Sequence, residues 1–349
     1  MTNSIKINDR SIGVGNSVYI VAEMSANHHQ DFNHAVKIIE AAKAAGADAI
    51  KIQTFTPDTM TINAQNDFFK IKDTIWNGQN LYDLYSEAST PWDWQPKLME
   101  VANNIGLDFF STPFDSSAVE FLEQMNAPVY KLASFELVDI PLLKCIAKTG
   151  KPAIFSTGMA SLDDIREAVE VFKESGGDQL ALLKCTSAYP APPEEMNLRA
   201  IPELSKIFDV PVGLSDHSIG NEASIVAVAL GACIVEKHFT LSRGMDGPDS
   251  FFSIEPDELK ALVTGIRHVE KVLGSVCFGT TKQEKSSLVF RRSLFVVRDI
   301  EVNEEFTEEN VRSIRPGFGL HPRHLEDVIG CKAKTNIPKG SPLDWDMIG

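Results

Sequence analysis

Two histidines occupy similar positions in the sequence, His217 in "GLSDHSIG" and His238 in "VEKHFTL", each at the end of an apolar run. If the two runs are neighbouring strands whose ends meet, both imidazoles can bind one metal ion instead of lying in an ordinary core. Two protein ligands leave positions open for water and a substrate oxygen, which suits a Lewis acid that polarises a carbonyl. A structural zinc site would need four ligands. We therefore expect His217 and His238 to hold a catalytic divalent metal.

Three lysines at corresponding places, Lys51, Lys131 and Lys184, form a second candidate group. Ammonium groups that point into one cleft of an acidic protein are typical of an anion site, most simply for phosphate plus carboxylate. The alternative is that Lys184 forms a Schiff base with a keto acid, as the lysines of aldolases do. Asp249, in the Gly-rich loop "SRGMDGPDS", is available to a sugar hydroxyl.

Other polar side chains also gather where predicted strands end. Buried parallel strands are nearly all apolar, so a polar residue inside one needs a reason. The further polar residues are Glu23, Asn27, His28, Gln53, Ser111, Thr112, Ser134, Glu136, Ser156, Thr157, Thr186, Ser187, Tyr189, Ser215, Asp216 and Glu236. Because side chains alternate, Lys51 shares a face with Gln53, and Glu236 with His238. One such residue is ordinarily bonded to loop backbone, but eight coincident ends predict an active site.

The elements that must position these residues are short apolar β-type runs alternating with amphipathic helical windows. The predicted strands are 18–24, 48–54, 107–113, 129–134, 152–158, 180–187, 210–216 and 233–239. Helix signals follow them, for example over 33–46, ending in Gly46, and over 162–177, with Ser161 as N-cap. Such alternation requires right-handed crossovers and a parallel sheet. Eight units in about 250 residues predict a (β/α)₈ barrel, with an open doubly wound sheet as the alternative.

The alternation of predicted strands and helices ends at the polar stretch "GTTKQEKSSLVFRRS". We therefore predict a barrel domain over 1–278, a linker over 279–292 and a small β-rich domain over 293–349, with one helical window at 307–313. The long polar insertion at 57–92 follows the second strand, so we expect a lid or wall that contacts substrate.

Composition limits the partners. The net charge of -15, from 48 acidic and 33 basic side chains, repels nucleic acid and anionic lipid. Five widely spaced cysteines are typical of reduced core thiols, and no export signal or membrane-spanning run is evident, so we expect a cytoplasmic protein.

The motifs together resemble the phosphoenolpyruvate-dependent sialic acid (nonulosonate) synthase family. The resemblance covers essentially the whole chain and includes "AEMSANHHQ", "IKIQTF", "STPFD", "YKLASFE", "FSTGM", "KCTSAYPAP", "GLSDHSIG", "VEKHFTLSR" and "IRPGFGL". It implies a metal-bearing barrel joined to a C-terminal antifreeze-like (SAF) domain, in a domain-swapped homodimer. Arg315 corresponds to the family's arginine that reaches the active site of the partner subunit.

The resemblance also implies roles for the residues. His217 and His238 would hold Mn²⁺, with Mg²⁺ or Co²⁺ as alternatives, to orient and polarise an open-chain aminosugar aldehyde. Carbon three of phosphoenolpyruvate attacks the aldehyde, water adds at carbon two and phosphate leaves. The implied catalytic residues are Glu23, Glu136, Lys131, His217 and His238, with Glu136 transferring a proton and Glu23 near the sugar. The implied substrate-binding residues are Asn27, Lys51, Gln53, Thr112, Ser134, Ser156, Lys184, Ser187, Tyr189, Ser215, Asp249 and Arg315.

Some motifs depart from those of N-acetylneuraminate synthases and look like the pseudaminic acid branch of the family. The chain has "NHHQ", "ASFE" and "CTSAYP" in place of "NHNG", "ASGE" and "CTNIYP". Phe135 in place of Gly and Ser187 in place of Asn make the expected sugar pocket more apolar. Such a pocket suits 2,4-diacetamido-2,4,6-trideoxy-L-altrose better than N-acetylmannosamine.

Three alternatives stay open. The N-acetylneuraminate or legionaminate branch would keep the chemistry and change the sugar. A Schiff-base aldolase using Lys184 would change the chemistry. A non-enzymatic carbohydrate or ice-surface binder rests only on the small C-terminal domain, whose "RRS" and "RPG" are charged where a flat, exposed binding face would be needed.

Overall fold

Eight buried strands pair in parallel and close into a barrel in the computed structural model, which describes residues 4–72, 74, 76–245 and 247–349. Around the barrel the order is β10-β3-β4-β5-β6-β7-β8-β9, so each strand pairs with the next in the chain and the last pairs with the first. The strands are β3 Tyr19–Glu23, β4 Ala49–Thr54, β5 Asp108–Pro113, β6 Tyr130–Leu132, β7 Ala153–Ser156, β8 Leu180–Cys185, β9 Val212–Asp216 and β10 Ile234–His238. The predicted barrel is confirmed, and the open sheet is excluded.

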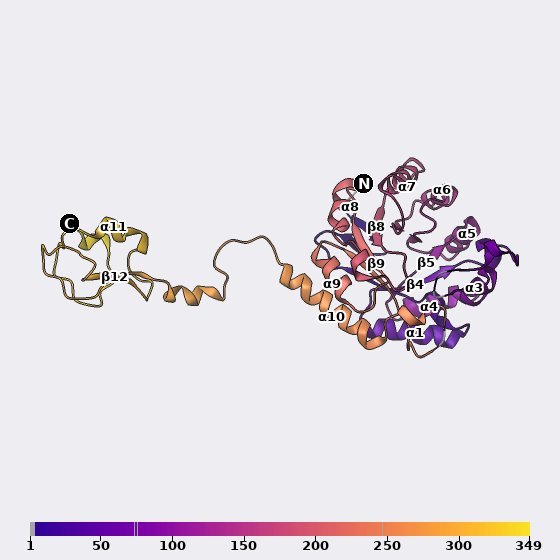
Figure 1. Cartoon of the computed structure of the whole chain (residues 1–349), viewed down its shortest axis with the longest axis horizontal. Coiled ribbons are helices and arrows are strands. Elements are labelled where there is room, and N and C mark those ends of the chain that lie inside the picture. Colours follow the sequence, from indigo (N-terminus) through magenta and orange to yellow (C-terminus); the bar gives the residue numbers. More distant parts are fainter. Residues whose placement is uncertain (1–3, 73, 75, 246) are drawn as a thin grey trace. The chain divides into compact units, whose positions relative to one another are not determined.

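Helices cover the outside of this barrel (Figure 1). They are α1 Phe32–Ala45, α2 Pro57–Met60, α3 Leu81–Ala88, α4 Gln95–Asn104, α5 Ser116–Gln124, α6 Ile140–Ala147, α7 Leu162–Glu174, α8 Ala200–Phe208, α9 Glu222–Ala229 and α10 Pro256–Leu273. Both predicted caps are confirmed. Gly46 ends α1 at φ 93°, a conformation that favours glycine, and Ser161 forms a capping box with Asp164 at the start of α7.

Side chains of each strand divide between two apolar layers, as the alternation of a pleated strand requires. Val21 and Leu183 point into the barrel, whereas Ile20 and Leu182 pack between the strands and the helices. An N-terminal hairpin that the sequence analysis missed, β1 Ser4–Ile7 and β2 Arg10–Gly13, adds three isoleucines to the interior layer. The hairpin closes the amino-terminal end of the barrel, so polar chemistry is confined to the carboxyl end.

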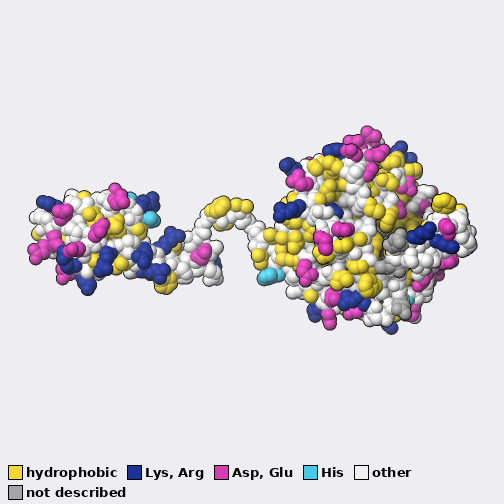
Figure 2. Space-filling view, in the orientation of Figure 1, with side chains coloured by type: hydrophobic (Ala, Val, Ile, Leu, Met, Phe, Trp, Pro, Cys, Tyr) yellow, Lys and Arg dark blue, Asp and Glu magenta, His cyan; other side chains and the backbone are white. Residues whose placement is uncertain are grey.

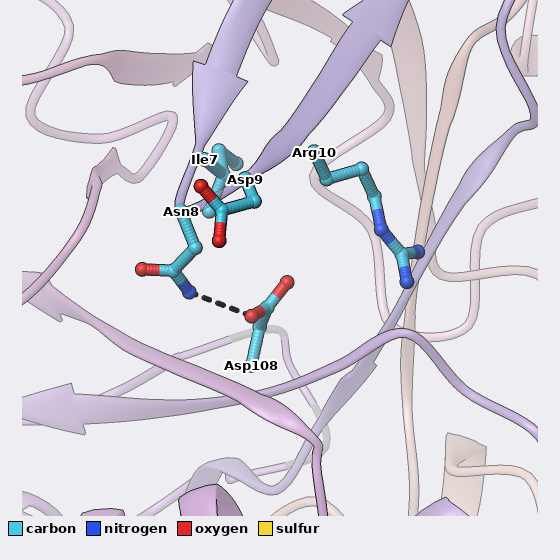
Figure 3. Close-up of a pocket in the computed structure, with 5 residues that line it drawn as sticks. All are labelled: Ile7, Asn8, Asp9, Arg10 and Asp108. Atoms are coloured by element: carbon cyan, nitrogen blue, oxygen red, sulfur yellow. Dashed lines mark hydrogen bonds between the residues drawn. The ribbon is translucent and has the colours of Figure 1, made fainter.

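A hollow of about 470 Å³ lies beside this hairpin, lined by residues 7–10 and Asp108 at the start of β5 (Figure 3). Three of its lining residues have partners: Asn8 donates to Asp108 at 2.7 Å, Tyr19 donates to the same carboxylate at 2.9 Å, and Arg10 pairs with Asp48. These paired groups have a structural role, at the opposite end of the barrel from the candidate catalytic residues.

The insertion at 57–92 is anchored at both of its ends. Near the end of α3, Gln30 donates to the carbonyls of Glu87 at 2.8 Å and Ser89 at 2.6 Å. At its base, the indole of Trp92 donates to the carbonyl of Phe55 at 3.2 Å. These bonds hold the described part of the insertion against the carboxyl end of the barrel, where η1 (Ser25–His28) follows β3.

The chain divides into two units, Met1–Gly274 and Ser275–Gly349, and the second has its own apolar core. In it β11 Ser293–Val296 pairs antiparallel with β12 Val311–Ile314, and α11 Leu325–Val328 is its one short α-helix among the described residues. The predicted helix at 307–313 is wrong. Thr307 donates its backbone N–H to the side chain of Asn310 in a turn, and the chain then extends as β12.

The surface matches the acidic composition. On the face in Figure 2, acidic and hydrophobic side chains are interspersed over the barrel unit. Among the described residues, no helix has the length and apolar character needed to cross a membrane.

Candidate active site

Two imidazoles meet at the carboxyl end of the barrel. In β9 and β10, Asp216 lies opposite Lys237, so the next residues, His217 and His238, leave adjacent strand ends together. Their ring centroids are 5.3 Å apart, at an interplanar angle of 63°. Both residues are buried: 6% of the surface of His217 and 8% of the surface of His238 is exposed. The convergence expected from the sequence is therefore present in the structure.

The pair fits a divalent metal. His217 has its Nδ1 at 3.1 Å from the carbonyl of Thr186, which holds the ring and leaves Nε2 for a ligand. The Nδ1 of His238 is buried and has no hydrogen-bond partner among the described residues, and burial lowers the pKa of this ring well below its usual value. A neutral imidazole with an unused nitrogen is the form that binds metals.

The pair is also not part of a closed cage. Among the residues that the structure describes, no three His, Cys, Asp or Glu side chains are grouped so as to hold a metal. Burial lowers the pKa of His217, but Cys185, the Thr186 carbonyl and Glu236 together raise it more, so metal binding there would release a proton. An open site of two imidazoles suits a catalytic ion more than a structural one.

A buried charge cluster lies beside the histidines. Lys51 is 2.7 Å from Glu23 and 3.8 Å from Glu236 in ion pairs, and 3.1 Å from the hydroxyl of Thr112. The side chains of the three charged residues are at most 7% exposed. Ser215 donates to Glu236 at 3.1 Å. Both carboxylates thus lie near the one ammonium group of Lys51, which supplies the opposite charge that buried ions require.

The titration of this cluster follows from its burial and its neighbours. Burial raises the pKa of Glu23, and Lys51 opposes the shift only in part. For Glu236 burial also raises the pKa, but Lys131 and Lys51 lower it more, so it stays ionised. Burial lowers the pKa of Lys51, and its two carboxylates raise it more. Glu23 is therefore the carboxyl group of the cluster that most easily takes up a proton.

Lys131 is a second buried lysine beside this cluster. It is 2% exposed, and it donates to Ser156 at 2.6 Å and to the carbonyl of Leu132 at 2.9 Å. No ion pair of Lys131 occurs among the described residues. Ser134 accepts from the backbone of Gly158 at 3.0 Å nearby. A Cβ on Gly158 would clash with the hydroxyl groups of Ser187 and Ser134, so only glycine lets these serines approach.

Lys184 does not join this cluster, which corrects the expectation of three converging lysines. Leu182 packs on the helix side of β8, so alternation directs Lys184 to the same side, where it donates to the Cys185 carbonyl at 2.7 Å. The inward residue is Cys185, which the sequence analysis assigned to the core. Its thiol lies 3.8 Å from both His217 Nδ1 and the Ser187 hydroxyl. Leu183, Cys185 and Ser187 stand at alternate positions of the sequence and so share one face of the strand. This alternation was the signal that could have identified Cys185 as an inward-pointing residue.

Glu136 is the second carboxyl group with an altered affinity for protons. Its Oε2 is buried without a hydrogen-bond partner, and burial raises its pKa to about 7. Lys131 opposes that shift. A carboxyl group that changes its charge near neutral pH suits proton transfer.

Two expected substrate contacts have other partners. Both amide hydrogens of Asn27 are used by the Phe239 carbonyl and Ser253, and its oxygen accepts from Ser250, so Asn27 holds loops together. Asp249 accepts from the backbone of Ala26 at 3.2 Å and lies 4.0 Å from Nδ1 of His238.

The remaining predicted residues fall into three groups. Tyr189 packs on His217, with ring centroids 4.4 Å apart, and Gln53 donates to Ser25 and Glu23 beside Lys51. Ser111 and Asp216 alternate to the helix side, where Ser111 bonds Thr54. Arg315 is exposed in the second unit, directly after β12.

A buried ion pair supports the histidines from the helix side. Lys237 is 2.9 Å from Asp216, and their side chains are 1% and 0% exposed. Asp216 also accepts from Ser218 and from Ser224 of α9, each at 2.6 Å, and Lys237 donates to the carbonyl of Ser218 at 2.7 Å. Since these residues directly precede His217 and His238, the pair ties the two strand ends together.

Comparisons with known proteins agree with this arrangement. The model of the NeuB family matches residues 38–277, and the model of the SAF domain matches residues 291–349. The pseudaminic acid synthase of Campylobacter jejuni subsp. jejuni serotype O:23/36 (strain 81-176) is 46% identical over 326 residues, which are 93% of this chain and 95% of that protein. The pseudaminic acid synthase of Helicobacter pylori is 43% identical over 331 residues, 94% and 97% of the two chains.

A solved structure of a related protein has a similar fold. The crystal structure of N-acetylneuraminic acid (sialic acid) synthetase from Leptospira borgpetersenii serovar Hardjo-bovis superposes with a TM-score of 0.74 at 33% identity, covering 82% of this chain and 96% of that one.

The Asp216–Lys237 pair yields a stability prediction. Lys237→Met leaves Asp216 ionised and buried without its partner, so the free energy of unfolding should fall by about 3–5 kcal/mol. Asp216→Asn combined with Lys237→Met removes both charges and should lose less than the single change. Urea unfolding followed by circular dichroism measures both. A single variant as stable as the wild type would show that the pair is not the tie described here.

Proposed function

Because the chain belongs to the NeuB family and ends in a SAF domain, we propose that it is a pseudaminic acid synthase. It condenses phosphoenolpyruvate with an open-chain N-acetylated aminosugar and releases phosphate. One observation carries the proposal: a buried ammonium without a carboxylate partner and two converging imidazoles lie at the same end of one barrel.

The phosphoenolpyruvate binds on the side of Lys131. A trianionic substrate needs cationic and hydroxyl donors, and Lys131 with Ser134, Ser156 and Ser187 supplies them. Lys51 contributes positive charge while its ion pair holds Glu23. The low exposure of Lys131 makes its attraction for an anion stronger than that of a surface lysine.

The aminosugar binds on the side of the histidines. His217 and His238 would hold the divalent metal, which when bound polarises the sugar carbonyl; we propose Mn²⁺, with Mg²⁺ or Co²⁺ as alternatives. Glu23 and Asp249 lie on this side and orient hydroxyl groups. Thr112, Gln53 and Ser215 hold Lys51, Glu23 and Glu236 in position by their hydrogen bonds.

Glu136 transfers the proton that water must lose when it adds at carbon two. The group is close enough to Lys131 for the ammonium to affect its pKa, and its unpartnered Oε2 is available to a water molecule. At neutral pH both of its charge states are populated, so it can accept the proton and release it again.

The proposed choice of sugar rests on one exposed aromatic side chain. Phe135 is 57% exposed, directly before Glu136. A methyl group of a 6-deoxy sugar can cover this ring, whereas a hydroxyl group there would lose hydration. N-acetylneuraminate and legionaminate synthesis are the alternatives within the family. A Schiff base on Lys184 is disfavoured because its ammonium lies on the helix side of β8.

The SAF domain completes the site in a homodimer. Arg315 is exposed and has no partner among the described residues, so it is available to an anionic substrate. We propose a domain-swapped dimer in which this arginine enters the site of the second subunit.

A phosphate-release assay tests the function. The purified enzyme, loaded with Mn²⁺, should release phosphate from phosphoenolpyruvate with 2,4-diacetamido-2,4,6-trideoxy-L-altrose, and more slowly with N-acetylmannosamine. Removal of the metal by EDTA should abolish the rate, and added Mn²⁺ should restore it. Stripped enzyme at full rate would contradict the account, and a borohydride-trapped pyruvate adduct on Lys184 would favour the aldolase.

The pKa of Glu136 yields a pH prediction. The carboxylate fraction rises from about pH 6 to about pH 8, so kcat/KM should rise over that range if Glu136 accepts the proton. Glu136→Gln should lower kcat by about 10²–10⁴-fold and remove the rise. The control is Glu170→Gln, the same change at an exposed carboxylate of α7, which should leave the profile unchanged. A rise that persists in Glu136→Gln would assign the titration to another group.

A further inference from the structure

The insertion at 57–92 contacts the candidate site through Trp76. The indole N–H of Trp76 donates to the carbonyl of Pro248 at 3.0 Å, across 172 positions of sequence. Its ring lies 5.7 Å from that of Tyr189, at an interplanar angle of 56°. Trp76 is half-buried, so one part of the ring stays accessible at the opening.

These contacts place Trp76 at the end of an aromatic wall beside the histidines. Tyr189 lies 4.4 Å from His217 and 5.0 Å from Phe252, and Phe252 lies 4.9 Å from His238. The rings of Trp76, Tyr189 and the two histidines are therefore linked by a continuous series of contacts. Such rings favour contact with C–H and methyl groups and exclude water from them.

The hydrogen bond adds a second effect. Pro248 directly precedes Asp249, which accepts from the backbone of Ala26 and lies 4.0 Å from His238. The bond from Trp76 therefore holds the loop that positions this carboxylate. Trp76 thus contacts the aromatic wall with its ring and, through its N–H, holds the loop that carries Asp249.

We propose that Trp76 determines specificity for the aminosugar. Its ring packs against the methyl-bearing part of an N-acetylated 6-deoxy sugar, and its N–H keeps the Asp249 loop closed over that sugar. The inference rests on the proposed function, and it assigns no contact with phosphoenolpyruvate to Trp76, because the contacts of Trp76 are with Tyr189 and Pro248 and not with Lys131, Ser134 or Ser156.

The test compares three variants by phosphate release. Trp76→Ala should raise KM for the 6-deoxy aminosugar by about tenfold while KM for phosphoenolpyruvate stays within about twofold. Trp76→Phe, which keeps an aromatic ring and loses the N–H, should restore most of that affinity. The preference over N-acetylmannosamine should fall in Trp76→Ala, because the lost contact is with groups that N-acetylmannosamine lacks.

The matched control is Trp92→Phe. Trp92 belongs to the same insertion, donates to a backbone carbonyl at 3.2 Å and packs on Phe121 at 4.6 Å, away from the histidines. It should leave both KM values unchanged.

Two results would overturn the inference. In an active wild-type enzyme, unchanged KM values in Trp76→Ala, or equal rises for both substrates, would refute the role of Trp76 alone. A wild-type enzyme that releases no phosphate with any aminosugar would refute the proposed function, and this inference with it.

Discussion

Burial of charge at one end of a closed barrel is the constraint on which the rest of the site depends. Lys51, Glu23 and Glu236 lie where water cannot solvate them, so each must be paired. The hydrogen-bond partners of Lys131 are neutral, Ser156 and a carbonyl, and its charge also lowers the pKa of Glu236. An anion that enters would lie beside the ammonium groups of Lys131 and Lys51, which favours a phosphorylated substrate over a neutral one.

The same constraint shapes the metal side. Burial keeps His238 neutral with a free nitrogen, and the helix-side pair of Asp216 and Lys237 holds the strand ends from which both imidazoles project. The ion pair of Asp216 and Lys237 positions the two strand ends, whereas His217 and His238 supply the nitrogen atoms that would bind the metal. The two roles fall to consecutive residues because side chains alternate along a strand.

Much of this was predictable from sequence. Eight strand-and-helix units give the barrel, barrel closure brings the strand ends together, and His217 and His238 follow on neighbouring strands. Errors arose where one-residue alternation decides the face. Lys184 points toward the helices and Cys185 toward the site, although both end the same strand. Asn27 looked like a ligand-binding residue because its partners, the Phe239 carbonyl and Ser253, are more than 200 positions away and cannot be identified from local pattern.

Elsewhere the missing information was tertiary. The hairpin of β1 and β2 is stable because its isoleucines enter the barrel interior, which no local signal near residue 5 announces. At Val311–Ile314, pairing with β11 overrides a weak helical pattern. The contact of Trp76 with Tyr189 joins an insertion to a distant strand end and needs coordinates to be seen.

The central claim is that His217 and His238 bind one ion together. The most direct measurement is the electron spin echo modulation spectrum of Mn²⁺ added to metal-free protein labelled with ¹⁵N-histidine. The account predicts coupling to two imidazole nitrogens in the wild type and to one in either His217→Gln or His238→Gln. A spectrum without imidazole coupling, or one that neither substitution changes, would contradict it.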